Sequence, residues 1–255
     1  MTYFDEYFLK GYKARAEVRE YRFPCDIEQK RKAEEQKCIR NILRNSYVQY
    51  RTEKRNTDAL RKLLMDYKKI VEKRTESYSK RRYNVFVYKY MVDIFIGNKA
   101  IASKMNVSVD TVQNDLRYVL DDLVLLCIGL PAASGNINSQ RKCIQFMLKN
   151  KDLLLYPVGN YVDAIWCQYG QIIREWHKKS VEITEQMLKA ADAYMEYCRD
   201  KENPSEVDGR KADMLEDNLN GMSYEAIAEK YGCSIDTIYD NMRDNETRLA
   251  QMLFV

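Results

Sequence analysis

A repeated stretch decides the fold of this chain: residues 101–117 read IASKMNVSVDTVQNDLR, and residues 227–243 read IAEKYGCSIDTIYDNMR. The two stretches align without a gap and are identical at 7 of their 17 positions. At several other positions one aliphatic side chain replaces another of similar size. The repeat therefore predicts one local structure that the chain uses twice.

Each copy has the features of two helices joined by a tight turn. Ala102 suits the point where the two helices cross, because only a small side chain lets helix axes approach closely. Asn106, replaced by Gly232 in the second copy, tolerates the left-handed backbone that a sharp turn requires. Ser108 and Ser234 are good N-caps for the helix that follows. We therefore predict a helix-turn-helix at each copy.

A further helix is predicted upstream of each copy, and each of these helices precedes a glycine. Gly97 in the first copy and Gly221 in the second suit a helix C-cap. Glycine and proline are rare in the chain as a whole, with 9 and 4 residues among 255. So few helix breakers favour a helical chain and argue against sandwiches, barrels and glycine-loop phosphate enzymes.

The predicted fold is all-α: a basic N-terminal helical hairpin plus two trihelical helix-turn-helix units joined by a helical middle region. An apolar stripe over residues 60–71 follows a shorter one, and the polar stretch 51–58 between them predicts a helix break. The middle region is predicted as a helix over 140–155 and a helical stretch over 161–199 that bends near Gly170 or Ser180. The four predicted segments are 1–82 (basic helical segment), 83–130 (first helix-turn-helix), 131–200 (helical connector) and 201–255 (second, acidic helix-turn-helix).

The formal net charge of +4 hides two unlike ends. Residues 1–85 hold 23 Lys and Arg against 13 Asp and Glu, a net charge of +10, whereas residues 201–255 hold 6 against 12, a net charge of −6. A basic segment attracts the phosphates of nucleic acids, although a solvated helix surface gives the same pattern. The acidic end repels phosphates and is better suited to a protein partner or to plain solvation.

The second helix of the first copy presents polar side chains on its outward face. Gln and Asn side chains pair with adenine through two hydrogen bonds in the major groove, and Arg pairs with guanine or a phosphate. The candidate DNA-binding residues are Asp110, Thr111, Gln113, Asn114, Arg117 and Tyr118, with Lys80, Arg81, Arg82 and Lys104 as candidates for phosphate contacts. The counterparts in the second copy are Ser234, Thr237, Tyr239 and Arg243.

The succession of a helix, a glycine, a short helix, a turn and a longer final helix resembles region 4 of the bacterial sigma-70 factors and their phage relatives. Residues 90–129 are similar to the C-terminal part of the ArpU/RinA-type phage late-gene transcriptional regulators. This resemblance implies sequence-specific DNA binding by the final helix of the first copy, and transcriptional control of a phage or mobile-element operon. The implied reading positions are Asp110, Thr111, Gln113, Asn114 and Arg117.

The chain departs from that pattern in two ways. It continues into a second, acidic copy, and its predicted recognition helix is less basic than is usual. Two other functions stay open: a phage assembly, packaging or adaptor protein whose trihelical units make protein contacts, and a divergent sigma-like factor that binds RNA polymerase. The expected partners are double-stranded DNA, RNA polymerase or another protein at the acidic C-terminal unit, and a second copy in a homodimer.

An enzyme is the least supported class, because the sequence has no recognisable catalytic frame or phosphate loop. The single histidine, His177, is expected to be structural, and the seven scattered cysteines are expected to be reduced, buried thiols, so we predict no metal and no cofactor. The chain begins without a signal peptide pattern and has no membrane-length apolar run. A cytoplasmic protein without a membrane partner is expected.

Overall fold

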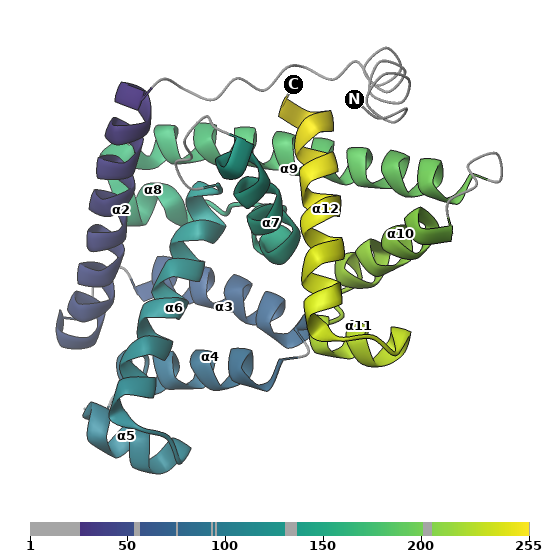
Figure 1. Ribbon diagram of the computed structural model, residues 1–255. Helices are drawn as coiled ribbons and strands as arrows, with labels where there is room; N and C mark the ends of the chain where they lie inside the picture. The colour runs from purple at the N-terminus through teal and green to yellow at the C-terminus, as the bar shows by residue number, and fades with distance from the viewer. Residues whose placement is uncertain are drawn as a thin grey trace. The chain divides into compact units, whose positions relative to one another are not determined.

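The computed structural model describes residues 26–53, 57–74, 76–92, 94, 96–130, 137–200 and 206–254. Within these residues the secondary structure is helical and contains no strand, which confirms the all-α prediction. The aromatic N-terminal stretch and residues 201–205 of the predicted linker lie outside the described residues. The helices in chain order (Figure 1) are α2 (Asp26–Glu53), α3 (Thr57–Lys73), α4 (Ser77–Tyr90), α5 (Asn98–Met105), α6 (Val109–Ile128), α7 (Ile137–Leu154), α8 (Tyr161–Trp166), the 3₁₀ turn η2 (Cys167–Tyr169), α9 (Gly170–Arg199), α10 (Glu206–Leu219), α11 (Tyr224–Tyr231) and α12 (Ile235–Phe254).

The chain forms two compact units, each assembled from separate stretches of sequence. Of the described residues, the α6 unit comprises those within 30–130 and 152–181, and the α12 unit comprises those within 26–29, 137–151 and 182–254. The predicted connector, residues 131–200, contributes to both units, because α9 supplies its first turns to the α6 unit and the rest to the α12 unit.

The core of the α6 unit is built on the apolar stripe of α3. All six members of that predicted stripe are buried, namely Leu60, Leu63, Leu64, Tyr67, Ile70 and Val71. They pack in one cluster with the C-terminal half of α6 and with α8. Trp166 is 2% exposed, and its indole Nε1 donates a hydrogen bond of 2.9 Å to the carbonyl oxygen of Ile39 in α2. Burying such large apolar surfaces is the main source of stability for a helical unit.

The breaks between the helices of this unit agree only in part with those predicted from the sequence. Helix α2 ends at Glu53 and α3 begins at Thr57, inside the polar stretch that predicted a break. A second break, between Lys73 and Ser77, has no glycine or proline to signal it. Consequently α4 begins at Ser77, and the predicted boundary between residues 82 and 83 falls inside this helix.

The middle region also matches the prediction with one difference. Helix α7 contains a kink at Asn150, whose side-chain Nδ2 donates to the carbonyl oxygen of Phe146 at 3.0 Å. The predicted bend lies at Gly170, where α9 begins after the 3₁₀ turn. Ser180 is instead helical and buried, and its Oγ accepts the backbone N–H of Leu130 at 2.8 Å. That hydrogen bond anchors the end of α6 against α9.

The cysteines among the described residues form no disulfide, and they are not all buried. Cys127 and Cys198 lie in the interior, as predicted. Cys38 and Cys167 are exposed, so the prediction of buried thiols is wrong for these two. Cys38 lies on the solvent side of α2, and Cys167 lies in the turn between α8 and α9. No helix in the described parts of the chain is both long and apolar enough to span a lipid bilayer.

Candidate nucleic-acid interface

Helices α4, α5 and α6 form a three-helix arrangement around a small apolar core. Its buried members are Val85 from α4, Ile101 and Ala102 from α5, and Val112 from α6. Helix α5 lies at the N-terminal end of α6, and α4 runs beside α6 (Figure 1). The small side chain of Ala102 is 5% exposed and lies in this core, as the sequence predicts for a close helix crossing.

The turn between α5 and α6 has the predicted geometry. Asn106 adopts the left-handed conformation, with φ 52° and ψ 49°, and caps the end of α5. The backbone N–H of Val107 then donates to the carbonyl oxygen of Ala102 at 3.0 Å. Ser108 caps α6, because its Oγ accepts the backbone N–H of Thr111 at 3.0 Å. The N-terminus of α6 is therefore fixed by side-chain and backbone hydrogen bonds.

The supporting helix ends earlier than predicted. Helix α4 ends at Tyr90, with Met91 as its C-cap. Gly97 has φ −72° and is the N-cap of α5, so the predicted C-cap role of this glycine is wrong. The run of apolar residues up to Ile96 concealed the true end of the helix.

One face of α6 brings the candidate reading residues together. Asp110, Gln113, Asn114 and Arg117 are exposed, and Tyr118 is 42% exposed. Thr111 is half-buried, and its hydroxyl lies 2.9 Å from the Ser108 Oγ, so it belongs to the cap more than to the open face. The opposite face carries Val112, Val119 and other buried residues.

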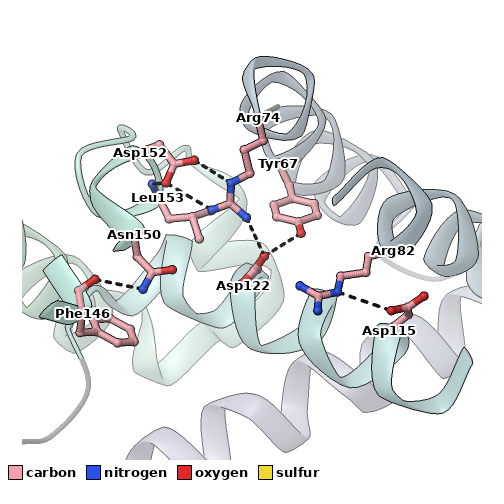
Figure 2. Close-up of polar contacts among 9 residues, drawn as sticks. All are labelled: Tyr67, Arg74, Arg82, Asp115, Asp122, Phe146, Asn150, Asp152 and Leu153. Atoms are coloured by element: carbon pink, nitrogen blue, oxygen red, sulfur yellow. Dashed lines mark hydrogen bonds and ion pairs between the residues drawn. The ribbon is translucent and has the colours of Figure 1, made fainter. Parts of the chain in front are cut away.

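Asp115 is the exception in this half of α6, because a carboxylate stands where the pattern predicts an apolar or exposed residue. It is 2% exposed, and Arg81 of α4 binds it with both Nε and a terminal nitrogen, at 2.9 and 3.1 Å. Arg82 Nε lies 3.4 Å from the same carboxylate, as Figure 2 shows. Two guanidinium groups offset the desolvation of a buried carboxylate. Arg81 and Arg82 thus join α4 to α6, whereas their neighbour Lys80 is exposed.

Aromatic rings lie close to three of the candidate cations, the most distant being the Arg117 guanidinium carbon, 5.4 Å from the ring centroid of Tyr118. The Arg82 guanidinium carbon lies 4.1 Å from the ring centroid of Tyr118 and 4.5 Å from that of Tyr78. On α5, the Lys104 Nζ lies 4.3 Å from the ring centroid of Tyr88. At these distances the ring face attracts a cation. The sequence analysis named Tyr118 but did not predict that tyrosines would hold these charges in place.

A second polar network fixes the C-terminal half of α6. Asp122 accepts a hydrogen bond of 2.8 Å from the Tyr67 hydroxyl, and the Arg74 terminal nitrogen lies 3.3 Å from it. Arg74 also binds Asp152 at 2.8 and 3.2 Å (Figure 2). Burial raises the pKa values of the Asp122 carboxyl and the Tyr67 hydroxyl. The sequence feature that could have indicated this network is a pair of aspartates, 121 and 122, inside an otherwise apolar stretch of helix.

Helices α10, α11 and α12 repeat the arrangement in the α12 unit. Gly232 has φ 60°, and the Ser234 Oγ accepts the backbone N–H of Thr237 at 3.1 Å, both as predicted. Gly221 has φ 87°, and the Met222 N–H reaches back to the carbonyl oxygen of Asp217 at 3.0 Å. This glycine therefore caps α10, which confirms the prediction for the second copy.

The outward face of α12 differs in charge from that of α6. Asp236, Asp240 and Arg243 are exposed, and Tyr239 is 52% exposed with its ring edge-on to Tyr224 at 5.1 Å. At the position of Asp115 this copy has Asn241, whose Nδ2 lies 3.4 Å from the sulfur of Met214. The two copies thus share backbone geometry and differ in the chemistry of their exposed faces.

Two further buried titratable groups, His177 and Glu246, have partners within their own units. His177 is buried and its Nε2 lies 2.9 Å from the carbonyl oxygen of Tyr156, and burial lowers its pKa. Glu246 is 1% exposed and pairs with Arg141 at 2.9 Å, and burial raises its pKa. Among the residues that the structure describes, no cluster of His, Cys, Asp and Glu side chains could hold a metal ion.

Comparison with protein-family models, with curated proteins and with solved structures gave no match to this chain. The candidate interface is therefore defined by the residues and geometry of the chain itself.

Proposed function

We propose that this protein is a sequence-specific DNA-binding transcription regulator that reads duplex DNA with the first half of α6. The observation that carries the proposal is the exposure of Gln113, Asn114 and Arg117 together on one face of a helix with a capped N-terminus. The opposite face of that helix is held by an apolar core and by the Asp115 ion pairs. A helix presented in this way can enter the major groove without reorganising.

The exposed side chains suit the edges of the bases. The amides of Gln113 and Asn114 can each give and accept one hydrogen bond with adenine, and Arg117 can donate two to guanine. Asp110 can accept a hydrogen bond from the amino group of cytosine. In this interpretation α5 and α6 are a helix-turn-helix, and the resemblance to the ArpU/RinA-type regulators extends the proposal to phage or mobile-element genes in the cytoplasm.

The second three-helix arrangement has a different proposed role. Its exposed aspartates at two positions, Asp240 and Asp244, stand where the first copy has Asn114 and Tyr118, within a segment of net charge −6. Carboxylates in these positions would repel phosphates. The face is suited to protein contacts, either with RNA polymerase or with another subunit of an assembly. A stable ring in light scattering, combined with weak DNA affinity, would favour the assembly or adaptor function instead.

The test is selection of bound genomic fragments at low salt, followed by footprinting of the enriched site. Replacing Gln113 or Asn114 by Ala should weaken binding to that site by about 1–3 kcal/mol for each bidentate pair of hydrogen bonds removed. Affinity for random duplex DNA should change little, because base contacts carry the specificity.

The second copy provides the matched control. Tyr239→Ala and Asp240→Ala alter the aligned positions on α12 and should leave the affinity for the selected site unchanged. Absence of any enriched sequence would refute base reading, and so would an equal loss of affinity on selected and random DNA.

A further inference from the structure

Two clusters of a cation and aromatic rings flank the exposed half of α6. The Lys104 cluster consists of Lys104 and Tyr88, at 4.3 Å. The Arg82 cluster consists of Arg82 between Tyr78 and Tyr118, at 4.5 and 4.1 Å. Lys104, Tyr78 and Tyr118 are exposed, and the Arg82 side chain is 24% exposed. Both cations are therefore held by rings and still reach solvent.

The two clusters lie at opposite ends of the candidate reading face. Lys104 is in the last turn of α5, directly before the turn that leads into α6. Tyr118 follows Arg117, the last candidate reading residue, by one position. On α4, Tyr78 and Tyr88 are ten residues apart, which corresponds to about 15 Å of helix. The rings of the two clusters are therefore anchored at separate places along α4, and the two strands that border a major groove are likewise separated, by a groove about 12 Å wide.

The geometry of each cation leaves donors for a phosphate. The ion pair of Arg82 with Asp115 uses Nε, and a guanidinium has additional N–H donors on its terminal nitrogens. A ring that already restrains the cation reduces the side-chain entropy lost when a phosphate binds. Tyrosine is also tolerated beside a phosphate, because its hydroxyl can donate a hydrogen bond.

The second three-helix arrangement supplies an internal comparison. Lys230 occupies the position of Lys104, but its Nζ binds both carboxylate oxygens of Asp217 at 2.7 Å. Asp244 occupies the position of Tyr118 and pairs with Lys211 at 2.6 Å. The same backbone therefore occurs with these positions occupied by intramolecular ion pairs. The ring-held cations are a feature of the α6 face and not a requirement of the fold.

We propose that the Lys104 and Arg82 clusters clamp the phosphates on the two strands that border the major groove entered by α6. This inference rests on the proposed function. It adds the phosphate contacts that position α6 along the DNA. Contacts with the phosphate backbones on both sides of the groove fix the depth and the angle of α6, while Gln113, Asn114 and Arg117 select the sequence.

The test measures the affinity of the full-length protein for a fluorescent random-sequence duplex by anisotropy over a range of salt concentrations. Lys104→Ala and Tyr118→Asp, which introduces the acidic residue of the second copy, should each lower the slope of log K against log salt by about 0.9 for every phosphate that is no longer neutralised. Tyr118→Phe keeps the ring and should retain the wild-type slope. Lys230→Ala is the matched control and should also retain it.

The outcomes separate this inference from the proposed function. Unchanged slopes for both Lys104→Ala and Tyr118→Asp, in a protein that binds duplex DNA, overturn the clamp and leave base reading intact. Reduced slopes in a protein that selects no sequence support the clamp and refute base reading. Absence of duplex binding by the wild type refutes both. If circular dichroism shows that Tyr118→Asp has lost helix, Lys104→Ala and Lys104→Glu decide the result.

Discussion

At the scale of single residues, the most informative side chain is the buried carboxylate of Asp115. A carboxylate that is 2% exposed is costly to bury without strong partners, and Arg81 and Arg82 supply them from consecutive positions of α4. Removing the aspartate leaves two partly exposed guanidinium groups that water can solvate. Removing the arginines leaves the buried carboxylate without these two cationic partners, which costs more stability.

This asymmetry predicts the effect of substitutions on stability. The double variant Arg81→Ala/Arg82→Ala should lower the free energy of unfolding by about 3–5 kcal/mol, and Asp115→Asn should lower it less. The measurement is urea denaturation followed by circular dichroism. Lys80→Ala, at an exposed neighbouring position, should stay within about 0.5 kcal/mol of the wild type. A larger loss for Asp115→Asn than for the double arginine variant would contradict this account.

At the scale of helices and turns, backbone conformation distinguishes glycines that look alike in the sequence. Gly232 has φ 60° and Gly97 has φ −72°. At neither position would a Cβ atom meet a neighbour within 4 Å. Only the backbone angle therefore separates the two, and only Gly232 needs a conformation that most residues avoid.

Substitution by alanine should show this difference directly. Gly232→Ala is expected to lower the free energy of unfolding by about 1–2 kcal/mol. Gly97→Ala should have a smaller effect, because the gain of about 0.4–1 kcal/mol from restricting the unfolded chain offsets the poorer preference of alanine for the N-cap position. Thermal unfolding of the two variants side by side makes the comparison. Equal destabilisation by both substitutions would show that the turn geometry is not the cause.

These elements also show how far the sequence alone leads. The repeat predicted the left-handed turns, the serine caps and the inward face of α6, because each depends on residues within four positions of one another. It did not predict the pairing of Asp115 with α4 or of Asp122 with Tyr67, since these partners are 34 and 55 residues apart. The break between α3 and α4 was missed for the same reason: no local breaker marks it, and the packing of α4 against α6 decides where that helix begins.

At the scale of the whole molecule, the chain presents the same three-helix arrangement twice, with a more acidic outward face in the second copy. The exposed faces of α6 and α12 share Arg117 and Arg243 at aligned positions, but the surrounding side chains differ in charge. Charge is therefore the property on which the proposed DNA-reading role of α6 and the proposed protein-contact role of α12 differ. Fold alone does not assign function.

Neutralising the acidic face tests this separation. Asp236→Asn/Asp240→Asn should raise the affinity for random duplex DNA by roughly 0.5 kcal/mol per charge removed at low salt, since like-charge repulsion with phosphates is relieved. The gain should fade toward physiological ionic strength, and a salt titration of filter binding measures it. Tyr239→Phe keeps the charge and is the control. An unchanged or lower affinity at low salt would argue that this face does not influence DNA binding.

Helix α6 is continuous from Val109 to Ile128, with one face of its first half open to solvent and most of its second half in the core. The reading surface therefore has no hinge of its own. Any ligand that fixes the open half also restrains the helix on which the core is assembled, so occupancy and thermal stability are linked quantities. In such a molecule, control of binding must act by melting or shielding the helix, because the helix cannot swing away from its own core.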